Sequence, residues 1–174
     1  TDDQKSGGFT YRLARVEGTD HSAFNLNTAT GQLSLKSQPD FETKSVYSIS
    51  VVSTDAGGKS YSKAYKISIS DVNDTPTITS TGITASKEDS AYSYKFAASD
   101  VDSGDTVTYA ATKLPSWLKF NAGTGVLSGT PTNSEVGTHS VVLTATDSSG
   151  AVDTQSFTIT VSNVNDTPTV TSTA

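Results

Sequence analysis

Hydrophobic and polar side chains alternate with a period of two through most of the chain. Apolar residues occupy every second position in residues 47–51, 65–69, 92–96, 141–145 and 157–161. Such alternation is typical of strands that turn one face toward a core. No segment shows a convincing helical period, and glycine-containing turns separate the runs. The pattern therefore predicts an all-β chain of short antiparallel strands, arranged as Greek-key β-sandwiches.

A second pattern repeats along the chain. Residues 71–82 read DVNDTPTITSTG and residues 163–174 read NVNDTPTVTSTA, 92 positions later. An acidic turn precedes each copy by 16 positions, beginning at Asp55 in the first case and at Asp147 in the second. Matched spacings of this kind indicate tandem modules, each about the size of one sandwich.

The repeat sets the expected module boundaries. We expect a first module over residues 1–74, a second over 75–166, and the stub of a third module's first strand over 167–174. Aligning Thr1–Tyr11 with Ser99–Tyr109 leaves the first module without a counterpart of residues 76–98. A module that lacks its opening strand, beside a free opening strand at the other end, leaves strand exchange between chains open.

Composition narrows the class of protein. Cysteine is absent, so a metal is the more plausible means of stiffening the modules, and a bacterial origin is favoured over an animal one. The net charge is −6 and Lys and Arg are scattered, which argues against nucleic acid as a partner. No apolar run is long enough for direct membrane insertion.

Oxygen-bearing side chains gather where the two modules meet. Calcium takes six to eight oxygen ligands from carboxylates, amides and backbone carbonyls. The candidates are Asp40, Glu42, Asp71, Asn73, Asp74, Asp100, Asp102 and Asp147, with the carbonyls of Val72 and Thr75. The alternative interpretation is that these acids are turn and cap residues, which we prefer for Asp55.

These residues carry a resemblance to a known family. The Asp40-x-Glu42 pair, the Asp55 turn and the closing DVNDTP make the first module similar to a cadherin repeat. The second module begins with Asp100-x-Asp102, and its LPSWLKFNAGTGVLSGTP at residues 114–131 resembles dystroglycan-type cadherin-like, Ig-like modules of bacterial surface adhesins.

The resemblance implies two or three calcium ions at the central junction. In that family's arrangement, Asp40, Glu42 and Asp74 would hold the outermost ion. Glu42, Asp71, the Val72 carbonyl, Asp74 and Asp102 would hold the middle one, and Asn73, the Thr75 carbonyl, Asp100, Asp102 and Asp147 the third. The family adds a Glu from the first module's early segment, which this chain does not contain at that place.

The outer junctions offer fewer ligands. Upstream, Asp2 is present but Gln4 stands where Asp102 stands in the second module. Downstream, Glu88, Asn165 and Asp166 are weaker metal candidates, because no Asp-x-Glu pair lies near Pro131. We expect fewer or looser ions there.

The combined expectation is a calcium-rigidified module pair in a secreted or cell-surface adhesion protein. Its partners would be neighbouring modules of the same chain, with homophilic protein contacts or polysaccharide as the adhesive ligand. A carbohydrate-binding module pair is the alternative, and it requires exposed aromatic residues on one face. No enzyme is expected, because His21 and His139 stand alone and no nucleophile–base arrangement is present. Trp117 is expected to be a core residue rather than a sugar-stacking platform.

Overall fold

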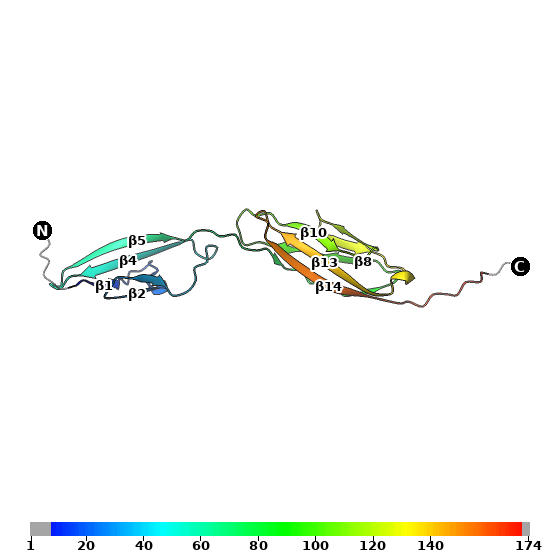
Figure 1. The fold of residues 1–174 in the computed structure, drawn as a ribbon, viewed down its shortest axis with the longest axis horizontal. Coiled ribbons are helices and arrows are strands. Elements are labelled where there is room, and N and C mark those ends of the chain that lie inside the picture. The colour runs from blue at the N-terminus through cyan, green and yellow to red at the C-terminus, as the bar shows by residue number, and fades with distance from the viewer. Residues whose placement is uncertain (1–7, 172–174) are drawn as a thin grey trace. The chain divides into compact units, whose positions relative to one another are not determined.

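The computed structural model describes residues 8–171, and the chain divides into two compact units. Unit 1 ends at Val72 and unit 2 begins at Asn73. Figure 1 shows that strands form both units, each with strands in two layers.

Unit 1 contains two small antiparallel sheets. The first has the order β1-β4-β5 and the second pairs β2 with β3. The elements are β1 (Thr10–Leu13), the 3-10 turn η1 (His21–Ala23), β2 (Phe24–Leu26), β3 (Leu33–Leu35), β4 (Val46–Thr54) and β5 (Ser60–Ser68). The alternation at residues 47–51 falls in β4, where Ile49 is buried.

Asp20 fastens η1 to the central strand of unit 1. Its carboxylate accepts a 2.5 Å hydrogen bond from Lys44 Nζ and a 2.8 Å bond from the Ser48 backbone N–H. The bond from Lys44, followed by that from Ser48, lowers the pKa of Asp20 below its ordinary value of 3.8.

We expect unit 1 to lose part of its stability in acid through Asp20. Because the folded pKa is depressed, the contribution is present above about pH 4 and is lost as pH falls through the folded pKa. In Asp20→Asn, hydrogen exchange across residues 46–54 should be faster than in the wild type at neutral pH. The difference should shrink in acid. A constant difference from pH 7 to about pH 2 would contradict this role.

Unit 2 is the more complete sandwich. Its main sheet has the order β10-β13-β14-β7, facing a second sheet of order β11-β12-β8, with β6 paired to β9. The strands are β6 (Thr77–Ile78), β7 (Ala85–Lys87), β8 (Tyr92–Lys95), β9 (Ala98–Ser99), β10 (Thr108–Lys113), β11 (Leu118–Asn121), β12 (Val126–Gly129), β13 (Gly137–Thr146) and β14 (Val152–Ser162); η2 is Asn133–Glu135.

The predicted alternations supply the core of unit 2. The buried cluster is Tyr92, Tyr94, Phe96, Leu118, Leu127, Val141, Leu143, Ala145, Ile159 and Val161. Edge-to-face ring contacts tie the two layers together, as between Tyr94 and Phe157, whose centroids are 5.6 Å apart. Strand pairing is antiparallel except for β7, which runs parallel to β14.

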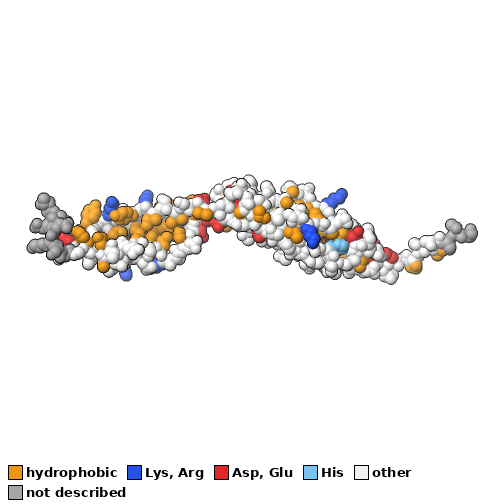
Figure 2. Space-filling view, viewed as in Figure 1, with side chains coloured by type: hydrophobic (Ala, Val, Ile, Leu, Met, Phe, Trp, Pro, Cys, Tyr) orange, Lys and Arg blue, Asp and Glu red, His pale blue; other side chains and the backbone are white. Residues whose placement is uncertain are grey.

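Residues 76–98 close unit 2, and no described segment fills the same place in unit 1. In unit 2, Gly82 and Tyr94 cover Phe157 of β14. Tyr65 lies at the equivalent place of β5, opposite Ile49, and 44% of it is exposed. Figure 2 shows hydrophobic side chains across much of the visible face of unit 1. In the described residues, unit 1 therefore has an exposed apolar face, whereas the corresponding face of unit 2 is covered by residues of unit 2 itself.

One turn makes this difference visible at atomic scale. Gly125, in the turn between β11 and β12, has a φ of +66°. A Cβ atom at this position would lie 2.6 Å from the Phe96 carbonyl oxygen and 3.3 Å from the Tyr109 ring. Gly31 has φ +73° and would meet Tyr11 at the same 3.3 Å, with no backbone neighbour corresponding to Phe96. The two turns are equivalent, and only the one in unit 2 packs against the Phe96 backbone, which has no counterpart among the described residues of unit 1.

The predicted fold class is confirmed: the described part of the chain is all-β, built of packed, mainly antiparallel sheets. Within the described part of the chain, no helix is long and apolar enough to cross a membrane.

Candidate metal centre

Three carboxylates of unit 2 meet at the end of the sandwich where residues 73–76 enter it. Asp100 directly follows β9, Asp105 lies in the turn before β10, and Asp147 directly follows β13. One oxygen of each lies within 4.8 Å of the others. The strands end there because Gly104, at φ +98°, and Gly150, at φ +93°, reverse the chain beside them.

Hydrogen bonds fix the orientation of each carboxylate. Asp100 Oδ1 accepts a 3.0 Å bond from the Asp102 backbone N–H, and Asp105 Oδ1 accepts one of 2.6 Å from Ser148 Oγ. Asp147 Oδ1 accepts from the Ala151 backbone N–H at 2.8 Å, and its Oδ2 from Asn73 Nδ2 at 2.9 Å. These hydrogen bonds therefore fix the positions of the three carboxylates.

The charge of this cluster is only partly compensated. Asp147 is 5% exposed, and the Asn73 amide lowers the pKa of its carboxyl below the ordinary 3.8. Oδ2 of Asp100 and Oδ2 of Asp105 are buried without a hydrogen-bond partner. Across the described residues, the only ion pair joins Lys44 to Asp20, in unit 1. Buried carboxylate oxygens without donors are costly, so this cluster is suited to a cation.

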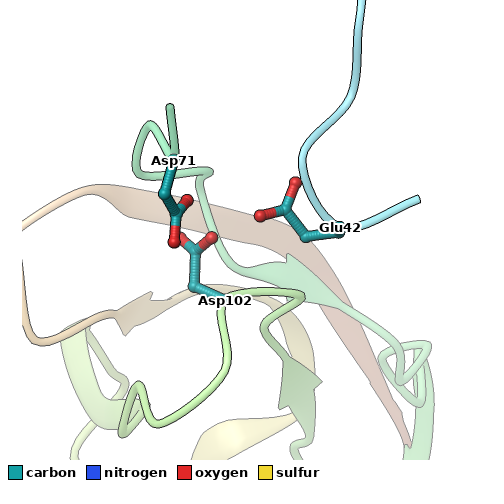
Figure 3. Close-up of side chains that lie close together, drawn as sticks. All are labelled: Glu42, Asp71 and Asp102. Carbon is teal, nitrogen blue, oxygen red and sulfur yellow. The ribbon is translucent and has the colours of Figure 1, made fainter. Parts of the chain in front are cut away.

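The start of unit 2 brings linker residues to the same end. The backbone N–H of Asp74 donates a 2.8 Å hydrogen bond to Asp102 Oδ2, while Asp102 Oδ1 is buried and has no partner. Asp102 lies on the loop after β9 (Figure 3). Together with the bond between Asn73 and Asp147, this places the Asn73 amide and the Asp74 backbone beside the acidic loops.

Unit 1 contributes a separate acidic pair near its end. A carboxylate oxygen of Glu42 lies within 4.8 Å of one of Asp71, and both side chains are exposed (Figure 3). Asp40 is held within a turn of the same unit. It accepts from Thr43 N at 3.0 Å and Thr43 Oγ1 at 2.9 Å, which lowers its pKa below the ordinary 3.8. These hydrogen bonds orient the Asp40 carboxylate within its turn.

The chemistry of this donor set fits calcium. The ligands are hard oxygens, with no Cys or Met in the chain and no His in the cluster. Two oxygens bound to opposite sides of one Ca²⁺ lie about 4.6–5.2 Å apart, which matches oxygens within 4.8 Å of one another. The carboxylates could hold the ion, with the Asn73 side chain, which already contacts Asp147, as a neighbouring oxygen ligand.

The far end of unit 2 holds a smaller polar group. Glu88 is 1% exposed; its Oε1 accepts from Asn163 Nδ2 at 2.8 Å and from the Val164 N–H, and its Oε2 has no partner. Asn133 Nδ2 donates to Asp166 Oδ2 at 3.2 Å, and Asn165 Nδ2 donates to the Asp166 carbonyl at 3.4 Å. Asp2, the upstream candidate, lies outside the described residues.

Asp55, Trp117 and His139, which the sequence analysis did not assign to a site, make contacts within their own units. Asp55 Oδ1 accepts a 2.8 Å hydrogen bond from the Lys59 N–H within its turn. Trp117 packs against the core with its ring 5.8 Å from those of Tyr92 and His139. His139 Nε2 lies 2.6 Å from the Glu135 carbonyl oxygen.

Sequence reasoning missed Asp105. It stands in Ser103-Gly104-Asp105, which has the composition of an ordinary turn. The alignment of the two modules held one signal, because Gly7 stands at the place of Asp105 in the first module. An acid present in only one of two otherwise matched turns was the available indication of a site.

Comparison with known proteins identifies the family. Residues 75–162 match the family model described as "He_PIG: Putative Ig domain". The chain belongs to this family of Ig-like domains.

Among curated relatives, the chain is 36% identical over 109 residues to "Serine-rich adhesin for platelets" of Staphylococcus aureus (strain MRSA252). That match covers 63% of this chain and 8% of the relative, so the chain spans a small part of the adhesin's length.

Solved cadherin structures share the fold. PcdhgB3 EC1-4 aligns with a TM-score of 0.65 at 22% identity, covering 90% of this chain and 41% of that one. Human Protocadherin-24 EC1-2 aligns with a TM-score of 0.65 at 21% identity, covering 94% and 85%. At these identities the likeness shows the fold alone.

Proposed function

We propose that this chain is a calcium-binding pair of cadherin-like modules, rigidified by Ca²⁺ at the junction between them, within a secreted or cell-surface adhesion protein. Its direct partners are neighbouring modules of the same protein. The observation that carries the proposal is that unit 1 ends, and unit 2 begins, in residues whose side-chain oxygens could bind a metal.

The linker connects two groups of candidate ligands. Glu42 and Asp71 form the group of unit 1, and the group of unit 2 consists of Asn73, Asp74, Asp102 and Asp147. Asp71 closes unit 1 and Asn73 opens unit 2, with Val72 alone between them. Their Cα atoms can be at most about 7 Å apart in any arrangement of the units. The Glu42–Asp71 pair is therefore tethered to the residues that contact Asp102 and Asp147.

Repulsion between the carboxylates, and its compensation by calcium, determines whether the junction is flexible or stiff. Without a cation, the acids of the two sets repel one another, and the units turn about a short linker. Calcium shared between the sets supplies the positive charge that offsets this repulsion. Asn73 and the Asp74 backbone hold the linker against unit 2, while Glu42 and Asp71 provide the ligands that tie unit 1 to it. A stiff pair can present an adhesive surface at a distance from the cell.

Calorimetry on Asp102→Ala tests this proposal. Wild-type chain titrated with CaCl₂ should show two or three sites. Asp102→Ala should lose at least one of them, or weaken it at least tenfold, while both units stay folded by circular dichroism. Asp55→Asn, which removes one acid from a turn of unit 1, is the charge-matched control and should bind as the wild type does. Equal binding by Asp102→Ala and the wild type would contradict the assignment.

Polysaccharide is the second candidate ligand, because β5 carries exposed aromatic side chains on which a sugar ring could stack. Tyr61 on β5 is 70% exposed, and Tyr65 lies on the same face of that strand with Lys63 Nζ 5.3 Å from its ring centroid. Binding to immobilised glycans that persists in EDTA and falls in Tyr61→Ser would favour this candidate. The absence of glycan binding would favour protein contacts.

A further inference from the structure

A cavity of about 400 Å³ in unit 1 brings basic side chains together. Its walls come from β1, η1 and β2, and Arg12, Arg15 and Lys36 line it together with His21. No acidic residue is among the described residues that line it. The chain as a whole has a net charge of −6, so this local excess of positive charge is created by the fold. A cavity lined by one sign of charge concentrates ligands of the opposite sign, which makes it a candidate site for an anion.

The guanidinium groups of Arg12 and Arg15 are available to a ligand. Within the described residues, neither side chain takes part in an ion pair or a hydrogen bond. Asp20, the acid beside η1, is already engaged by Lys44 and by the Ser48 backbone N–H. A guanidinium presents five N–H donors in a planar fork that matches a carboxylate. The two arginines can therefore supply paired hydrogen bonds to an acidic group.

Hydrogen bonds hold the third cation at the wall of the cavity. Lys36 Nζ donates to the Ser22 carbonyl oxygen at 2.7 Å, and the Lys36 backbone N–H donates to the Ala23 carbonyl oxygen at 2.9 Å. An ammonium group has three N–H donors, so two remain for a ligand. His21 Nδ1 lies 3.3 Å from Thr19 Oγ1, which leaves Nε2 as its second polar atom. An anchored cation is what a preformed anion site requires.

The rest of the lining selects the body of the ligand. Leu13 and Leu26 are half-buried apolar side chains, and Ser22 and Thr28 add hydroxyl groups. A sugar ring with a carboxylate matches this mixture, because it joins C–H groups, hydroxyls and an acid in one compact body. An aspartate or glutamate side chain would bring only two oxygens to three cations, and inorganic phosphate has no apolar part. The volume lies within the range of about 300–1,000 Å³ that is usual for small-molecule sites.

The corresponding place in unit 2 lacks two of these cations. By the strand registers of the two units, Ala110 stands at the place of Arg12 and Thr130 at the place of Lys36. The basic cavity is therefore a property of unit 1 and not of the module fold in general.

We propose that the cavity of unit 1 binds a uronate residue of an acidic polysaccharide, with its carboxylate on Arg12 and Arg15 and its other oxygens within reach of Lys36. This inference goes beyond the calcium-binding junction and does not depend on it. It also gives the polysaccharide ligand a sugar class and a site apart from the aromatic face of β5, because β1 and β5 are opposite edges of one sheet. No metal takes part, so binding persists in EDTA.

The test follows the amide chemical shifts of the isotope-labelled full chain, in EDTA, as a hyaluronan tetrasaccharide that contains glucuronate is added. The shifts should saturate and should be confined to amides around the cavity. Arg12→Gln with Arg15→Gln should weaken binding at least tenfold. Lys59→Gln with Lys66→Gln removes two exposed cations that do not line the cavity, and it should bind as the wild type does. A tetrasaccharide of N-acetylglucosamine, which has no carboxylate, should not bind.

Three results would overturn this inference: equal affinity for the neutral tetrasaccharide, equal affinity for dextran sulfate or poly-glutamate, or unchanged affinity in Arg12→Gln with Arg15→Gln. Neither arginine makes a polar contact within the described residues, so that variant should melt as the wild type does, and equal melting shows that lost binding is not a failure to fold. Tyr61→Ser should leave uronate binding unchanged. The outcome is distinct from that of the CaCl₂ titration of Asp102→Ala, because it is measured without calcium.

Discussion

Calcium removal lowers the melting temperature of unit 2 by about 15 °C or more, on the proposed assignment. A ligand that binds only the folded state at about 1,000 times its Kd contributes about 4 kcal/mol. For a domain of this size, 1 kcal/mol corresponds to about 4–8 °C. The physical cause is the set of buried oxygens on Asp100, Asp102 and Asp105 that have no hydrogen-bond partner. Differential scanning calorimetry in CaCl₂ and in EDTA measures the effect.

Two controls make this result specific. MgCl₂ in place of CaCl₂ should restore only a small part of the stability, because Mg²⁺ demands shorter and more regular coordination. Asp105→Asn should show a smaller difference between CaCl₂ and EDTA than the wild type. Identical melting curves in CaCl₂ and EDTA would mean that the acids of unit 2 are solvated turn residues.

Covering the open face of unit 1 stabilises it by about 3 kcal/mol. In unit 2, the segment 76–98 supplies Tyr92, Tyr94 and Phe96 to the core. Each buried aromatic side chain contributes about 2 kcal/mol before the cost of ordering the segment. In the module alignment Ser99 corresponds to Thr1, so a second copy of residues 76–98 fused directly before Thr1 keeps the natural spacing.

Hydrogen exchange reports where the added segment packs. Amides of β3 and β5 should exchange more slowly in the fusion, because their equivalents β12 and β14 pair with β8 and β7 in unit 2. A matched fusion with Tyr94→Ser and Phe96→Ser in the added copy should stabilise unit 1 little. Equal stability of the two fusions would show that the exposed face is not a vacant core surface.

The sequence predicted the strands of this fold better than their pairing. Alternation at residues 92–96 and 141–145 identified strands and their inward side chains, because a half-buried strand requires that period. The parallel pairing of β7 with β14 was not predictable. β7 has three residues, and its partner lies 75 positions away, since Ala85 pairs with Thr160.

The candidate site was predictable where local spacing encodes it. Asp100 and Asp102 stand two apart and Asn73 stands in a repeated motif, so the residues themselves indicated oxygen ligands. Asp105 was missed because its position beside Asp147 results from the fold, which brings the turns before β10 and after β13 together. The sequence also did not reveal that Asp40 accepts hydrogen bonds from Thr43, since a metal ligand and a turn residue would use the same carboxylate.

The most direct test of the central claim measures the distance between the two units with and without calcium. The chain has no cysteine, so Lys66→Cys in unit 1 and Lys119→Cys in unit 2 place one spin label on an exposed position of each. Double electron–electron resonance should give a broad distance distribution in EDTA and a narrow one in CaCl₂, and the narrowing should be lost in Asp102→Ala. A distribution of the same width in both conditions would contradict rigidification of the junction by calcium.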